Sequence, residues 1–85
     1  MLFRSRVEGR KHLKSELKSL WLLEDVISTG GSSLSAALHL VEEGYPLKGI
    51  ACVLDREMGG IEKLALALKL PVLALYRIRD VLKDT

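Results

Sequence analysis

The chain has 85 residues, of which 48% are hydrophobic and 28% are charged, and its formal net charge is +2. A chain of this length forms one small core at most and buries a modest fraction of its surface, so it gains stability from a partner. The weak net charge supplies no overall field for nucleic acid or a membrane surface, and no apolar run reaches the roughly 20 residues that span a bilayer, so we expect neither as a partner.

The N-terminal part of the chain is strongly basic. Residues 1–18 hold six Lys or Arg against two Glu, a local balance of +4 that leaves −2 for the rest. A solvated surface is the ordinary explanation for such charges, and a role facing phosphates is the alternative. Phe3 and Val7 suit a short strand. We therefore treat residues 1–19 as a basic N-terminal segment and residues 20–85 as one folded domain.

A continuous apolar run, Leu20 to Leu23, predicts a strand that is covered on both faces and ends at two adjacent carboxylates, Glu24 and Asp25. The turn that follows is rich in glycine and in hydroxyl side chains: Ser28, Thr29, Gly30, Gly31 and Ser32. We expect Gly30 and Gly31 to adopt positive φ and to turn backbone N–H groups inward, with Ser32 or Ser33 as the N-cap of the next helix.

This turn suits an anion. Backbone N–H groups, hydroxyl donors and the positive end of the following helix would meet at one point, which favours a phosphate. Two carboxylates repel a phosphate unless a group that needs acceptors lies between them, such as a sugar diol or a divalent cation. The ligand that satisfies both features is a sugar phosphate.

Helical spacing follows the turn, with Gly44 as a left-handed stop and Pro46 just beyond it. The apolar residues at this spacing are Leu34, Ala37, Leu38 and Val41. A second strand is expected at Gly49 to Leu54. It contains Cys52, the only cysteine, whose apolar neighbours are typical of a buried thiol in a reducing compartment, so we expect a cytoplasmic protein.

A loop at residues 55–60, reading D-R-E-M-G-G, precedes a second helical pattern made by Ile61, Leu64, Ala65 and Leu68. Pro71 begins a third strand that runs through Tyr76, and Ile78, Val81 and Leu82 indicate a short final helix. The alternation of strands and helices predicts an α/β fold whose parallel sheet has about three strands. Both loops then leave strands at their carboxyl ends, where open α/β sheets bind ligands.

The first of these loops carries a family resemblance. Its residues resemble the phosphoribosyl pyrophosphate (PRPP) signature of the type I phosphoribosyltransferases: Glu24, Asp25, Val26, Ile27, Ser28, Thr29, Gly30, Gly31 and Ser32. The resemblance implies that Glu24 and Asp25, the catalytic residues by this likeness, bind the ribose 2- and 3-hydroxyls. It implies that the glycine turn wraps the 5-phosphate, and that residues 20–85 form the C-terminal half of a Rossmann-like family fold. The alternative is an ordinary left-handed turn, in which two adjacent carboxylates would have no role.

The second loop resembles the D-R-E-x-G-G segment of orotate phosphoribosyltransferases, including the corresponding domain of uridine monophosphate synthases. Its residues are Asp55, Arg56, Glu57, Met58, Gly59 and Gly60. By this resemblance Arg56 binds the base, and a guanidinium presents the paired donors that match a carboxylate and an adjacent carbonyl. The alternative is a local ion pair of Arg56 with Asp55 or Glu57.

The resemblance implies a glycosyltransferase of pyrimidine biosynthesis that converts orotate and PRPP into orotidine 5′-phosphate and pyrophosphate. It implies Mg²⁺ as cofactor, bound through PRPP and not directly by the protein, with Glu24 and Asp25 as the only candidates for a direct contact. Neither His12 nor His39 has the neighbours of a metal site. In the family, the remaining parts of the active site come from sequence that would precede Met1, so we expect a portion of an enzyme or a chain that another subunit completes.

The partners implied are small molecules, namely PRPP with orotate or a nucleotide, and a second copy of the chain. We expect a homodimer because a sheet this small leaves an edge strand and an apolar face uncovered. Two alternatives to the enzyme remain open. One is a regulatory module that binds PRPP or a nucleotide without turnover, and the other is a structural remnant that has lost ligand binding.

Overall fold

The computed structural model describes residues 2–3 and 18–83. In chain order its elements are β1 (Leu2–Phe3), β2 (Leu20–Ile27), α2 (Gly31–Glu42), β3 (Leu47–Asp55), α3 (Gly60–Leu68), β4 (Val72–Arg77) and α4 (Ile78–Lys83). The expected strand at Phe3 is therefore present as β1, while Val7 and most of the expected basic segment lie outside the described residues.

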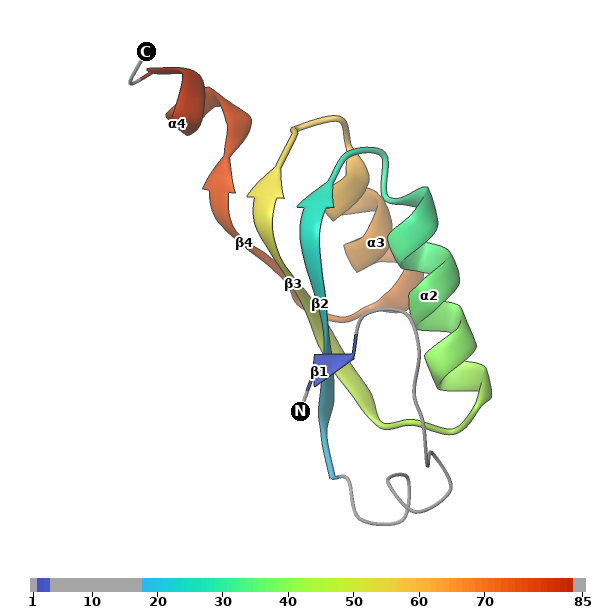
Figure 1. The fold of residues 1–85 in the computed structure, drawn as a ribbon. Helices are drawn as coiled ribbons and strands as arrows, with labels where there is room; N and C mark the ends of the chain where they lie inside the picture. Colours follow the sequence, from blue (N-terminus) through green and yellow to red (C-terminus); the bar gives the residue numbers. More distant parts are fainter. Residues whose placement is uncertain (1, 4–17, 84–85) are drawn as a thin grey trace.

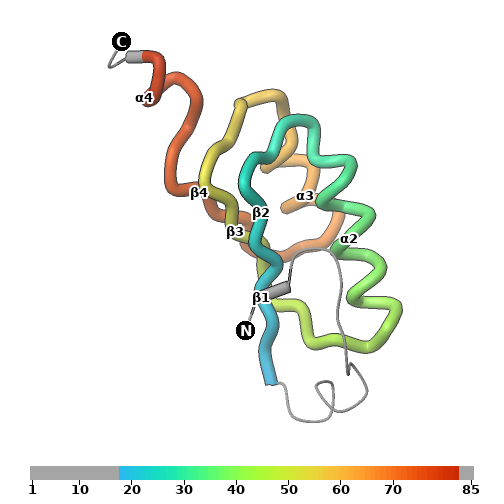
Figure 2. Tube along the Cα trace, viewed as in Figure 1, coloured from blue at the N-terminus to red at the C-terminus, as the bar shows by residue number. Residues whose placement is uncertain are grey.

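The strands form one parallel sheet in the order β1-β2-β3-β4. Figure 1 shows α2 and α3 side by side on one face of this sheet, with α4 standing beyond the end of β4. The tube in Figure 2 follows the same path and shows the turns after β2 and β3 emerging together at one end of the sheet. The predicted α/β fold with three principal parallel strands is thus confirmed, and β1 adds a short fourth strand.

The covered face of the sheet carries the core. Leu22 of β2 pairs in register with Ile50 of β3, which pairs with Val72 of β4, so the three side chains share a face. Leu22 and Ile50 are completely buried, and Val72 packs against their cluster. From the helices, Ala37, Leu40 and Leu64 join the same core.

The opposite face is not covered by any described element, so the expectation of a strand covered on both faces is wrong for β2. Leu23 pairs with Ala51, which pairs with Leu73, and Leu23 and Leu73 are 40% and 57% exposed. Val53 and Leu75 continue the same face by the two-residue period of a strand, and both are exposed. One side of the sheet is therefore an open apolar surface.

The end of α2 follows the prediction. Gly44 has φ 88°, its N–H donates to the carbonyl of Val41, and the N–H of Tyr45 donates to the carbonyl of Leu40. These two bonds make a Schellman motif, which satisfies carbonyls that the helix end leaves without intrahelical partners. The glycine is needed here because a positive φ strains any other residue.

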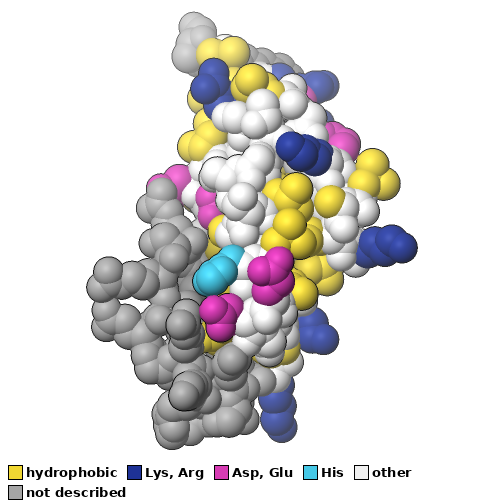
Figure 3. All heavy atoms as spheres, turned by 90° about the vertical axis from the view of Figure 1, so that its right-hand side faces the viewer, with side chains coloured by type: hydrophobic (Ala, Val, Ile, Leu, Met, Phe, Trp, Pro, Cys, Tyr) yellow, Lys and Arg dark blue, Asp and Glu magenta, His cyan; other side chains and the backbone are white. Residues whose placement is uncertain are grey.

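Only part of the apolar spacing that predicted α2 is buried. Leu38 and Val41 are 43% and 48% exposed, and the buried residues of the helix are Ser33, Ala37 and Leu40. The buried stripe is thus rotated by about one residue from the stripe of Leu34, Ala37, Leu38 and Val41. Hydrophobic side chains also gather on the outer side of the helical layer (Figure 3), where Leu38, Val41 and Leu66 are exposed.

In the described part of the chain, no helix has both the length and the apolar character needed to cross a membrane.

Candidate functional site

The first turn joins the end of β2 at Ile27 to the start of α2 at Gly31. Gly30 has φ 88° and is the N-cap of α2, and its carbonyl accepts a hydrogen bond from the N–H of Leu34 at 2.9 Å. Gly31 is already the first helical residue and has no positive φ, so the expectation for this second glycine is wrong. The expected serine cap is wrong too, because no side chain caps the helix and Ser33 is buried.

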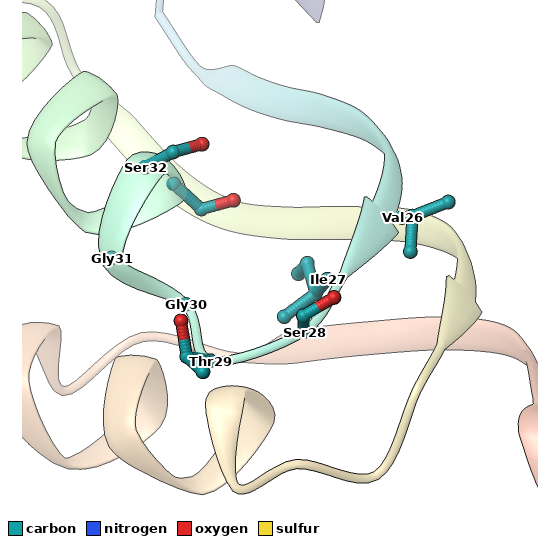
Figure 4. A pocket seen from close by; sticks show the side chains of 8 residues that line it. Val26, Ile27, Ser28, Thr29, Gly30, Gly31 and Ser32 are labelled. Atoms are coloured by element: carbon teal, nitrogen blue, oxygen red, sulfur yellow. The ribbon is translucent and has the colours of Figure 1, made fainter.

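A pocket of about 160 Å³ lies at this turn and is lined by residues 26–33. Seven of the lining residues, Val26 to Ser32, belong to the motif singled out in the sequence, and Ser33 is the addition. Figure 4 shows the side chains of Ser28, Thr29 and Ser32 around the same bend of the backbone. The volume is below the roughly 300–1,000 Å³ of sites for drug-sized ligands, so the pocket suits one part of a ligand such as a phosphate group.

The acidic pair lies inside β2, because the strand continues through Glu24 and Asp25 to Ile27 rather than ending before them. Glu24 pairs in register with Cys52 and is partly buried, whereas Asp25 is exposed. Successive residues of a strand point to opposite faces, so the two carboxylates leave the strand in different directions. Neither carboxylate lines the pocket of the glycine turn.

The second turn, residues 55–60, is bonded to the first through the backbone. The N–H of Arg56 donates to the carbonyl of Ile27 at 2.9 Å, and the N–H of Gly60 donates to the carbonyl of Ser28 at 3.1 Å. A Cβ on Gly60 would collide with the carbonyl oxygen of Ser28 and would lie 2.6 Å from Cγ2 of Ile27. A Cβ on Gly30 would lie 3.0 Å from the carbonyl oxygen of Gly60. The two turns therefore touch at two glycines that admit no side chain.

Within the second turn, Asp55 is buried and its Oδ1 accepts a hydrogen bond from the N–H of Glu57 at 2.8 Å. Glu57 has φ 59°, an uncommon conformation for a residue other than glycine. Its carboxylate accepts hydrogen bonds from the backbone N–H and from Nε of Arg79 in α4, and forms an ion pair with that guanidinium. Arg79 thereby lowers the pKa of Glu57, and Glu57 raises the pKa of Arg79.

Arg56 is exposed, and among the described residues it forms no ion pair. The alternative of a local pair with Asp55 or Glu57 is therefore not what the structure contains, since Glu57 is paired with Arg79. Arg79 is not among the residues that the sequence motifs indicate. The signal was its position just after the third predicted strand, because parallel strands bring the residues that follow them to one edge of the sheet.

Cys52 is buried as expected, and burial raises the pKa of its thiol, with further contributions from the charges of Asp55 and Glu24. His39 lies on the surface, with its Nε2 3.8 Å from the carboxylate of Glu43. The described residues contain no group of three or more His, Cys, Asp or Glu placed to hold a metal ion.

No protein-family model matches this chain. Among curated proteins, it is 40% identical over 81 residues to the orotate phosphoribosyltransferase of Sorangium cellulosum, a match that covers 95% of this chain and 41% of that protein. It is 42% identical over 59 residues to the orotate phosphoribosyltransferase of Thermosynechococcus vestitus, covering 69% of this chain and 31% of that protein. The chain thus spans about two fifths or less of the length of these relatives.

Solved structures agree with these sequences. The fold resembles orotate phosphoribosyltransferase from Aeropyrum pernix with a TM-score of 0.72 at 23% identity, over 78% of this chain and 39% of that one. It also resembles the orotate phosphoribosyltransferase of Mycobacterium tuberculosis, solved in complex with PRPP, with a TM-score of 0.67 at 29% identity, over 73% of this chain and 37% of that one.

Proposed function

We propose that this chain, which belongs to the type I phosphoribosyltransferase family and is related to the orotate phosphoribosyltransferases, binds PRPP or a ribose 5-phosphate as one portion of such an enzyme. The observation that carries the proposal is the pocket of residues 26–33 at the N-terminus of α2. Unpaired N–H groups of the first helical turn and the positive end of the helix dipole attract an anion, and the serine and threonine hydroxyls add donors.

The acidic pair is proposed to bind the ribose. Glu24 and Asp25 precede the phosphate pocket on the same strand, and carboxylates accept hydrogen bonds from a diol. The two side chains leave the strand in different directions, so we propose that they bind different groups. One carboxylate would bind a ribose hydroxyl, and the other would bind the second ribose hydroxyl or Mg²⁺. Val26 and Ile27 would contribute to the site by their position in the pocket wall.

Arg56 is proposed to bind the base. Its backbone is tied to Ile27 at the end of β2, so the guanidinium extends from the same edge of the sheet as the phosphate pocket. Planar paired donors on an exposed arginine match the carboxylate and adjacent carbonyl of orotate.

The activity proposed for the complete protein is transfer of the phosphoribosyl group from PRPP to orotate, which gives orotidine 5′-phosphate and pyrophosphate. Mg²⁺ bound with PRPP would neutralise charge on the departing pyrophosphate. We propose a homodimer, supported by the open apolar face at Leu23, Val53, Leu73 and Leu75. A cytoplasmic location is supported by the free Cys52.

Calorimetry with PRPP, Mg²⁺ and orotate, followed by an assay for orotidine 5′-phosphate, tests this function. Binding of PRPP with formation of the nucleotide is the expected result for the complete enzyme. Binding without turnover would favour the regulatory module over the enzyme, and no binding of PRPP or ribose 5-phosphate would contradict the proposal and favour the structural remnant.

The acidic pair has its own test. Replacing Asp25 by Asn should weaken ribose 5-phosphate by about 1–3 kcal/mol, the scale of a lost charge-assisted hydrogen bond, while leaving inorganic phosphate almost unchanged. Glu24→Gln is the matched variant on the other face of the strand. Calorimetry with the two ligands measures both effects. An equal loss for both ligands would mean that the carboxylates act on the shape of the turn and not on the sugar.

A further inference from the structure

The contact between α4 and the second turn is the most extensive charged interaction among the described residues. Arg79 donates from its backbone N–H to Oε1 of Glu57 at 3.1 Å, and from Nε to Oε1 and Oε2 at 3.0 and 2.7 Å. Its terminal nitrogen forms an ion pair with the same carboxylate. A single arginine on the last helix thus binds one glutamate that lies 22 residues earlier in the chain.

This contact stabilises a turn whose backbone conformation is strained. Glu57 has positive φ, a conformation that strains a residue with a side chain. On one side of it, the buried Asp55 accepts the N–H of Glu57, and on the other side Arg79 binds the carboxylate. Arg56 lies between these two fixed residues, and its own N–H is bonded to Ile27.

The same contact decides which carboxylates are available to Arg56. Glu57 is its immediate neighbour and Asp55 lies on the other side, so both are candidates for neutralising the guanidinium. The carboxylate of Glu57 is occupied by Arg79, and Oδ1 of Asp55 is occupied by the N–H of Glu57. As a result, Arg56 is exposed and forms no ion pair within the described residues.

We infer that Arg79 is a positioning residue for the base site: by binding Glu57 it keeps that carboxylate from pairing with Arg56 and so leaves Arg56 available for an anionic base. This inference rests on the proposed function, because it assigns a ligand to Arg56. The recognised group is a carboxylate on a planar ring attached to a ribose 5-phosphate. A nucleotide that lacks this carboxylate should not depend on Arg79.

Two ligands separate the base from the rest of the nucleotide. Orotidine 5′-phosphate and uridine 5′-phosphate differ only by the carboxylate on the ring, so the ratio of their affinities reports on Arg56. We expect the wild-type chain to favour orotidine 5′-phosphate by about tenfold, the scale of a charge-assisted hydrogen bond. Arg79→Gln should remove most of this preference while leaving the affinity for uridine 5′-phosphate and for ribose 5-phosphate within about twofold.

A second variant distinguishes positioning from a structural role. In the double variant Glu57→Gln with Arg79→Gln, the carboxylate that competes for Arg56 is gone, so the preference for orotidine 5′-phosphate should return. A merely structural role of the ion pair predicts no such rescue. Arg77→Gln is the matched control, since Arg77 lies two residues before Arg79 and its guanidinium forms an ion pair with Asp80, at 3.2 Å, instead of with Glu57.

Calorimetry on these four proteins with the three ligands gives distinct results for each failure. If the wild-type chain binds no ribose 5-phosphate, the proposed function fails, and the inference falls with it. If the wild-type chain binds ribose 5-phosphate but shows no preference between the two nucleotides, the role of Arg56 is refuted and with it that of Arg79. If the preference exists and survives Arg79→Gln, or is lost equally in Arg77→Gln, or is not restored in the double variant, the positioning role is overturned.

Discussion

The two turns at the carboxyl edge of the sheet lie against each other but are held by different forces. The first turn, residues 28–31, depends on backbone geometry, with Gly30 as a left-handed cap and Gly60 pressed against Ser28. The second turn depends on charged side chains, with Glu57 bound to Asp55 and to Arg79. The backbone contacts between the two turns tolerate changes of pH but not an added methyl group, whereas the ion pair at Glu57 depends on pH.

The largest effect that sharpens this contrast is expected from Gly60→Ala. The new Cβ would meet the carbonyl oxygen of Ser28 and would lie 2.9 Å from the N of Gly30, so the turns must separate. Overpacking of this kind costs about 1–3 kcal/mol, and the midpoint of urea unfolding should fall accordingly. Gly31→Ala is the control, because a Cβ there meets nothing within 4 Å and Gly31 has no positive φ. Equal losses in the two variants would show that the turns are not in close contact.

A smaller effect is expected from Gly30→Ala, and the neighbouring glycine supplies its control. The methyl group at Gly30 is strained by φ 88° and lies 3.0 Å from the carbonyl oxygen of Gly60, whereas a methyl group at Gly31 meets nothing within 4 Å. We expect Gly30→Ala to lower stability by about 1–2 kcal/mol and to weaken ribose 5-phosphate binding, with Gly31→Ala near wild type in both. Calorimetry and urea unfolding measure the pair. The reverse ranking would mean that Gly31 is the left-handed residue.

Acid should loosen only the second turn, and this is the smallest effect. The pKa of Glu57 is lowered in the folded state because Arg79 donates hydrogen bonds to its carboxylate. The contribution of Glu57 to stability is therefore complete above its unfolded pKa and is lost as the pH falls through the lower folded value. In an NMR titration, the amide of Arg79 should shift with a midpoint below the ordinary value for glutamate, while the amide of Leu34, which donates to the carbonyl of Gly30 in the first turn, follows a different course. A common midpoint for both amides would contradict separate support of the two turns.

The alternation of strands and helices and the location of the glycine turn could be predicted from the sequence, because apolar runs and helical spacing are local patterns. It did not distinguish Gly30 from Gly31, because either glycine can adopt positive φ and the packing of Gly60 selects the first. The end of β2 was predicted too early, at the acidic pair. Carboxylates are uncommon in strands, and only the pairing with β3 shows that Glu24 and Asp25 belong to β2.

Two further features depended on tertiary contacts. The sequence of α2 offers two overlapping apolar stripes that share Ala37, and contact with the sheet buries the one containing Leu40 rather than Leu38. The Glu57–Arg79 pair joins residues that are 22 positions apart, so no local spacing indicates it. Both features follow from how the helices lie against the sheet and not from the residues one by one.

Phosphate binding by the glycine turn after β2 is tested most directly by an NMR titration of the labelled chain with ribose 5-phosphate. We predict saturable shifts of the backbone amides of Thr29, Gly30 and Gly31, with inorganic phosphate competing for the same signals and with Gly30→Ala suppressing them. Shifts confined to other parts of the chain, or no shifts at millimolar ligand, would contradict the claim.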